Sequence, residues 1–94
     1  MMRACTLGDP STQGDAFITT VFPTVTVFAQ PVAVATGLGA ELHYHGDSVY
    51  PAYPLTGSLT VTAGGFPVHR EGDLRACVAH QSLASLNLSV FVGL

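Results

Sequence analysis

The chain has 94 residues, of which 48% are hydrophobic and 10% are charged, and its net charge is −3. A domain of this length buries only about 65% of its unfolded surface, so we expect a metal, a disulfide or a large partner to supplement its core. Its three arginines are scattered and it has no lysine. This excludes nucleic-acid binding, which needs a clustered basic face.

The scarcity of charge predicts a protein that is partly covered by another molecule, since soluble domains usually carry about 25% charged residues. The uncharged stretch between Asp15 and Glu41 is long enough to cross a bilayer. Its two prolines and alternating Thr-Val residues nevertheless favour a strand over a helix. The first ten residues contain no apolar core of a signal peptide, so we expect synthesis in a reducing cytoplasm. There, Cys5 and Cys77 would be free thiols or metal ligands rather than a disulfide.

Strands are predicted, in chain order, over residues 24–28, 59–62 and 86–92, where polar and apolar side chains alternate. No segment sustains apolar residues at the i, i+3, i+4 and i+7 spacing of an amphipathic helix. Ten glycines and six prolines supply many turns. The chain is therefore predicted to be all-β.

An internal repeat relates these segments. Residues 24–37 align with residues 60–73 at an offset of 36, without a gap. A truncated third copy occupies residues 89–93, and the pair Gly-Asp occurs at residues 8–9 and again at residues 72–73. The chain thus contains nearly three strand-turn-strand units.

Each unit has a physical logic. Thr60-Val61 favours a strand, Ala63-Gly64-Gly65 a tight turn, and Pro67-Val68 an edge strand in which a missing N–H is tolerated. Gly72-Asp73 then ends the unit, because glycine accepts a positive φ and the carboxylate can accept a backbone hydrogen bond. Asp9 and Asp73 are therefore predicted to be turn residues rather than catalytic acids. Three such units around one axis would form a compact, roughly threefold body.

The second full unit, residues 57–73, resembles the repeat of the PAAR family, which runs approximately Gly-Ser-x-Thr-Val-x-Val-Asn-Gly-Lys-Pro-Val-Ala-Arg-x-Gly-Asp. Here the segment runs Gly57-Ser58-Leu59-Thr60-Val61-Thr62-Ala63-Gly64-Gly65-Phe66-Pro67-Val68-His69-Arg70-Glu71-Gly72-Asp73. Segments 7–12 and 89–93 are similar to the usual start and end of a family member, so the resemblance spans the chain. The chain departs from the pattern at residues 34–37, which lack the arginine and the Gly-Asp pair, and at His69, where alanine is usual.

The resemblance implies one PAAR-like domain over residues 1–94. Its expected fold is all-β, a small conical β-hairpin repeat fold with a pseudo-threefold arrangement, zinc-stapled near the apex. Members of this family cap trimeric β-helical spikes in contractile phage tails and type VI secretion systems. We therefore predict a structural spike tip, one copy per trimer, that contacts the target membrane transiently. We predict no enzymatic activity, no nucleic acid and no small-molecule substrate.

The expected location is the tail baseplate of a virion, after synthesis in the host bacterial cytoplasm. Two other functions are left open by the sequence: a type VI secretion PAAR adaptor, or a free zinc-binding β-module that recruits another protein. The residues do not distinguish a phage tail from a tailocin or a secretion system.

Metal ligation is predicted at two short motifs. His43 and His45 form a His-x-His pair, which a strand places on one face. Cys77 and His80 form a Cys-x-x-His pair, which a tight turn can fold onto one ion. Family members typically hold zinc with three histidines and one cysteine, so the resemblance implies these four residues as a closed tetrahedral structural site.

Each of these residues also has a simpler interpretation. The histidine pair is also compatible with an exposed polar strand face, and Cys77 with a buried apolar thiol. Cys77 and His80 could form a nucleophile and base, but the sequence offers no oriented acid for them. His69 is predicted to be a surface or packing histidine rather than a ligand, and Cys5 a small core residue. Residues 49–54, Val-Tyr-Pro-Ala-Tyr-Pro, are predicted to be an apolar connection packed on the cone, with contact to a membrane or partner as the alternative.

Overall fold

A computed structural model of the protein describes residues 2–11, 17–27, 29–45, 48–76, 81–83 and 90–92, with the backbone alone for residues 43–45. These residues form short antiparallel hairpins and no helix, which confirms the all-β prediction. The strands are β1 (Met2–Arg3), β2 (Val21–Val27), β3 (Gln30–Ala33), β4 (Leu42–His45), β5 (Ser48–Pro51), β6 (Thr62–Ala63), β7 (Phe66–Pro67) and β8 (Phe91–Val92). The described part of the chain has no helix that is long and apolar enough to cross a membrane.

Two predicted strands differ from the observed ones. The segment 24–28 falls largely within β2, but of the segment 59–62 only Thr62 belongs to a strand. The Ser58 Oγ accepts hydrogen bonds from the backbone nitrogens of Thr60, at 3.2 Å, and Val61, at 2.9 Å. This local capture, a known competitor of the strand ladder, bends the chain before β6. Residues 86–89 of the third predicted strand lie outside the described residues.

The prediction for residues 49–54 is wrong in its first half. Residues 49–51 belong to β5, which pairs with β4, and every residue of β5 is exposed. The apolar character of the segment is used only beyond the strand, where Ala52 and Pro54 are buried. Residues 49–51 therefore form one strand of a projecting hairpin, and only the residues that follow this strand are packed.

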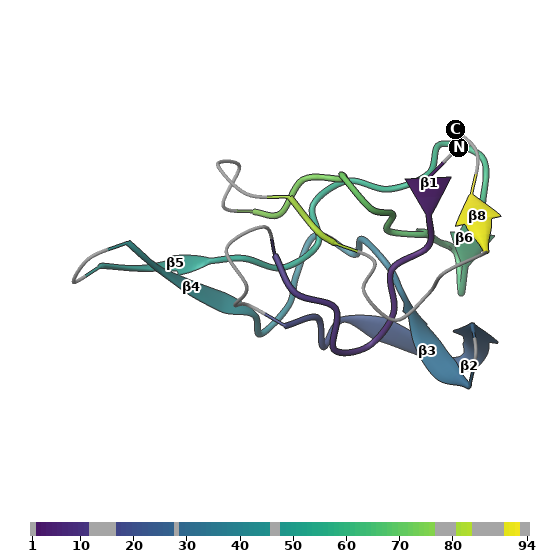
Figure 1. The fold of residues 1–94 in the computed structure, drawn as a ribbon, viewed down its shortest axis with the longest axis horizontal. Helices are drawn as coiled ribbons and strands as arrows, with labels where there is room; N and C mark the ends of the chain where they lie inside the picture. Colours follow the sequence, from purple (N-terminus) through teal and green to yellow (C-terminus); the bar gives the residue numbers. More distant parts are fainter. Residues whose placement is uncertain are drawn as a thin grey trace.

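Three hairpins share one register, and we call them the three arms: β2–β3, β6–β7 and β1–β8. The pair Thr26↔Pro31 in the first arm corresponds to Thr62↔Pro67 in the second, at the offset of 36 found in the sequence. In the third arm the strands come from the two ends of the chain, and the corresponding pair is Phe91↔Arg3. The first and last strands of the chain consequently lie beside each other (Figure 1).

The β6–β7 arm has the tight turn that the sequence predicts. Gly64 and Gly65 are its two central residues, with φ values of 61° and 86°. Two positive φ values are what the hairpin turn favoured by strand twist requires, and glycine adopts them without a Cβ clash. The turn also needs the missing side chain, because a Cβ on Gly64 would lie 2.2 Å from the Cε1 of Phe22.

The chain continues from β1, β3 and β7 into three inner segments, residues 3–7, 31–35 and 67–71, that bond one another in a closed ring. The Ala33 nitrogen donates to the Cys5 oxygen, the His69 nitrogen to the Ala33 oxygen, and the Cys5 nitrogen to the His69 oxygen, each at 2.9 Å. A second ring joins the same three segments with the donor direction reversed: the Leu7 nitrogen donates to the Pro31 oxygen at 2.9 Å, the Ala35 nitrogen to the Pro67 oxygen at 2.9 Å and the Glu71 nitrogen to the Arg3 oxygen at 2.8 Å. Each inner segment therefore pairs with both others.

The core lies on two sides of this ring. One cluster comprises Ala4, Val32, Val34, Ala63, Val68 and Val92, with Phe22 and Val27 packed against it. The other is smaller and comprises Cys5, Ile18 and Ala33. The burial of Cys5 confirms its prediction as a small core residue.

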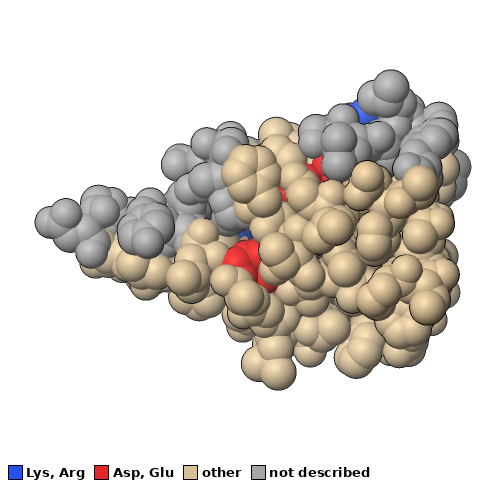
Figure 2. Space-filling view, turned by 90° about the horizontal axis from the view of Figure 1, so that it is seen from below, with Lys and Arg blue, Asp and Glu red and all other residues tan. Residues whose placement is uncertain are grey.

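The β4–β5 hairpin projects away from the three arms, which lie together at the opposite end of the molecule (Figure 1). We call that opposite end the base. The molecule is longer than it is wide, with extents of 36 × 24 × 22 Å. Figure 2 shows few acidic or basic side chains among the coloured residues of one face, in line with the low charge of the sequence.

Candidate functional site

The β4–β5 hairpin carries the first two predicted ligands. Position 43 pairs with Tyr50 and position 45 with Ser48, so the ladder places these four positions on one face of the hairpin. Leu42 and Val49 lie on the other face, and both are exposed. The predicted same-face placement of His43 and His45 is thus met by the backbone, while their side chains lie outside what the structure describes.

The other two predicted ligands, Cys77 and His80, lie outside the described residues. The chain just before them is attached to the end of β5, since the Ala76 nitrogen donates to the Tyr53 oxygen at 2.8 Å. The four predicted ligands are not brought together by any described contact. Within the described ranges, no group of three or more His, Cys, Asp and Glu residues is placed to hold a metal ion.

Arg75 and Ser82 stand on either side of residues 77–80 in the sequence, and their side chains contact each other. We call this pair of residues the neck. Both side chains are fully buried, and the Arg75 Nε donates to the Ser82 Oγ. The same guanidinium donates from Nη1 to the Ala52 oxygen at 2.8 Å and from Nη2 to the Asp9 oxygen at 3.2 Å. A planar group with five fixed donors can serve several carbonyls at once. Arg75 therefore ties the neck both to the end of β5 and to the first Gly-Asp turn.

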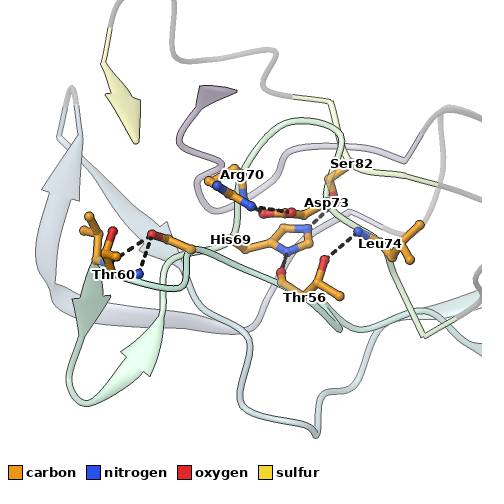
Figure 3. Close-up of polar contacts among 9 residues, drawn as sticks. Thr56, Thr60, His69, Arg70, Asp73, Leu74 and Ser82 are labelled. Carbon is orange, nitrogen blue, oxygen red and sulfur yellow. Dashed lines mark hydrogen bonds and ion pairs between the residues drawn. The ribbon is translucent and has the colours of Figure 1, made fainter. Parts of the chain in front are cut away.

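His69 completes this buried polar cluster, which we define as His69, Arg75 and Ser82. Figure 3 shows His69 between Thr56 and Ser82. Its Nδ1 lies 2.6 Å from the Thr56 oxygen and its Nε2 lies 2.6 Å from the Ser82 Oγ. A carbonyl can only accept, so Nδ1 carries the proton and Nε2 accepts from the Ser82 hydroxyl. Burial lowers the pKa of His69 to about 4, so the ring is neutral at pH 7.

The prediction for His69 is therefore half right. It is a packing residue, fully buried, and the surface alternative is wrong. Both ring nitrogens are engaged in hydrogen bonds, which leaves neither for a metal in this arrangement. Thr56 is also fixed on its side-chain end, because its Oγ1 accepts from the Leu74 nitrogen at 2.9 Å (Figure 3).

Glu41 fixes the start of β4 from the other side. Its buried carboxylate accepts from the backbone nitrogens of Thr19 and Thr20, each at 3.0 Å, and from the Thr20 Oγ1 at 2.8 Å. Gly39 leaves the space for this contact, since a Cβ there would lie 2.5 Å from the Glu41 Oε1. The carboxylate thereby joins the root of the projecting hairpin to the chain that leads into β2.

Sequence analysis missed Glu41, Arg75 and Ser82 as organising residues. The only signal for the first two was that a chain with so few charges retains them. Nothing in the local pattern around Ser82 distinguishes it from a surface serine. All three act through partners at least seven positions away in the chain.

The two Gly-Asp pairs are turn residues, as predicted. The Asp9 Oδ2 accepts from the Thr6 nitrogen and the Asp73 Oδ2 accepts from the Arg70 nitrogen, both at 2.8 Å. The Arg70 Nε also donates to the Asp73 Oδ2 at 2.9 Å (Figure 3), and this hydrogen bond raises the pKa of Arg70. The carboxylates shape the backbone.

Comparisons of the chain with protein-family models, with curated proteins and with solved structures find no match.

Proposed function

We propose that the chain is a spike tip that caps a trimeric β-helical spike of a contractile injection machine. In a phage tail its place would be the centre of the baseplate, where it would sharpen the spike for penetration of the target envelope. The observation that carries this proposal is the closed ring of hydrogen bonds among the three inner segments. A single chain whose three repeated units surround one axis offers a matching surface to a threefold shaft.

The two ends of the molecule suit this role differently. The base gathers three arms of equal register, and the opposite end is a single projecting hairpin (Figure 1). Strand edges exposed at the base would invite aggregation unless a partner covered them. A conical repeat fold, broad at the base and narrow at the hairpin, accounts for this division. The exposed Leu42, Val49 and Tyr50 on the hairpin suit transient contact with a membrane.

A structural zinc held by His43, His45, Cys77 and His80 forms part of the same proposal. Two thiolate- and imidazole-bearing motifs supply the donors that zinc prefers, and positions 43 and 45 share a face of the hairpin. When bound, the ion would cross-link the hairpin to residues 77–80, which stand between Arg75 and Ser82 in the sequence. Its apparent binding free energy would be on the order of 10–16 kcal/mol. The polar cluster would hold that segment at its root with or without the metal.

Size-exclusion chromatography with the purified trimeric spike protein of the same machine tests the proposal. We expect co-elution, together with about one zinc per chain by elemental analysis of the purified protein. A stable, soluble monomer without affinity for the trimer would contradict the spike-tip function and favour a free β-module that recruits another protein. Absence of stoichiometric zinc would contradict the metal staple alone.

A further inference from the structure

The threefold pattern of the backbone extends to the outer strands of the arms. Thr26 in β2, Thr62 in β6 and Phe91 in β8 hold the same position in the three arms, opposite Pro31, Pro67 and Arg3 respectively. All three are exposed, whereas the residue that follows each of them is directed toward the core. The arms therefore have the same inside and the same outside at this position.

The preceding position repeats even more closely. Val25, Val61 and Val90 correspond to one another, and their side chains are 42%, 41% and 40% exposed. The three arms thus each expose a valine at this position to a similar degree, although their sequences and chain connections differ. All three arms lie at the base, away from β4–β5 (Figure 1). A surface repeated three times around an axis is complementary to a partner that repeats its own surface three times.

Phe91 is the departure from this pattern. Its side chain is 52% exposed, and the two equivalent positions hold threonine. Buried aromatic side chains at the centre of an interface commonly supply a large share of its affinity. On a threefold partner, a single aromatic would meet one of three identical recesses, and turning the cap by a third of a turn would offer it the next.

We propose that Phe91 anchors the cap by filling one of three equivalent apolar recesses at the end of the trimeric spike. This inference rests on the proposed function and adds the contact that carries the affinity. It also adds a property that an asymmetric partner would lack: the arm that bears the aromatic does not matter. The anchor is defined by its position in the repeat and not by its place in the chain.

Moving the aromatic from one arm to another tests this directly. The affinity of the full chain for the purified spike trimer is measured for the wild type, for F91T, and for the double variants F91T/T62F and F91T/T26F. L38T is the matched control, since Leu38 is 76% exposed in the connection from β3 to β4 and belongs to none of the arms. Thermal unfolding of each variant checks that the fold is kept, which is expected because every changed side chain is exposed.

We expect F91T to weaken binding about 30-fold, the scale of a typical anchor residue, and L38T to change it less than about twofold. Each double variant should regain an affinity within about threefold of the wild type, because a cap turned by a third of a turn presents an aromatic at the same position of the repeat. Unchanged binding by F91T overturns the inference, as does a loss that neither double variant repairs. A wild-type chain that does not bind the trimer at all contradicts the proposed function itself, so the two failures are distinguishable.

Discussion

The two Gly-Asp turns share the same backbone hydrogen bonds but enclose different side chains. In each turn the aspartate nitrogen donates to the oxygen three residues earlier, Asp9 to Thr6 at 3.1 Å and Asp73 to Arg70 at 3.0 Å. The backbone carbonyl oxygen of Asp9 accepts from the Ile18 nitrogen at 2.9 Å, and that of Asp73 accepts from the Ser82 nitrogen at 3.1 Å. The same contacts thus recur at an offset of 64 residues.

The side chains enclosed by the two turns are unlike. The first encloses the apolar pair Cys5 and Ile18, and the second encloses the polar pair His69 and Ser82 in the equivalent places. All four are fully buried. The comparison teaches that Gly-Asp fixes the backbone by local chemistry, while the interior is free to be apolar or polar. Arg75 contacts the backbone of the first turn, but only in the polar version does it contact an enclosed side chain, Ser82, and only that version adds a dependence on pH.

The largest effect should come from Arg75, which only the second turn uses as an internal partner. Arg75→Met leaves the Ala52 and Asp9 oxygens and the Ser82 hydroxyl without this donor, at a cost of about 3–5 kcal/mol in the free energy of unfolding. The equivalent position near the first turn is Ser11, also buried, where Ser11→Ala should cost about 1 kcal/mol. Urea denaturation of both variants measures the difference. Equal costs would contradict the assignment of Arg75 as the organising residue.

A smaller effect should follow from acid, and only through the second turn. The pKa of His69 is lowered from 6.5 to about 4 by burial, despite the nearby carboxylate of Asp73. The unfolded chain therefore binds the proton more readily, so the contribution of His69 is complete above pH 6.5 and is lost as the pH falls toward 4. Between these limits the protein should lose about 3 kcal/mol of stability.

Copying the first interior into the second turn supplies the control. The double variant His69→Cys, Ser82→Ile should lose most of that dependence, because burial raises the pKa of the corresponding thiol, Cys5, and keeps it neutral. Unfolding free energies at pH 7.5, 6, 5 and 4.5 measure both proteins. A double variant that remains as acid-sensitive as the wild type would show that other groups cause the dependence.

The smallest expected effect tests whether the two backbones are equivalent. Gly8 and Gly72 have φ values of 87° and 85°, and an added Cβ would meet no atom closer than 3.5 Å at either position. Strain in φ is then the main cost of Gly8→Ala and of Gly72→Ala, about 1–2 kcal/mol each. Thermal denaturation should give the same loss for both within about 0.5 kcal/mol. A larger difference between the two losses would contradict the equivalence of the two turn backbones.

The sequence predicted what local chemistry determines. The offset of 36 between two arms, the glycine turn of β6–β7 and the carboxylate turns all follow from residue types at fixed spacing. The bend before β6 was not predicted, since a strand pattern over 59–62 conceals the capture of that backbone by Ser58. The polar cluster could not be predicted, because its members meet only when segments distant in the chain have folded together.

The candidate metal set is predicted to a different depth in its two halves. Positions 43 and 45 lie two residues apart on β4, as the predicted strand requires, and the placement of the two histidine side chains stays a prediction. For Cys77 and His80 the spacing of the motif is a prediction that the described residues do not test. The neck formed by Arg75 and Ser82 was missed, although it fixes the chain on both sides of that motif.

Native mass spectrometry of the chain mixed with the purified spike trimer tests the central claim most directly. The three repeated units within one cap should together occupy the whole end of the proposed spike. We therefore predict a single complex of three spike chains and one cap. A complex with three caps per trimer would contradict the account, because each spike chain would then bind its own copy. So would the absence of any complex.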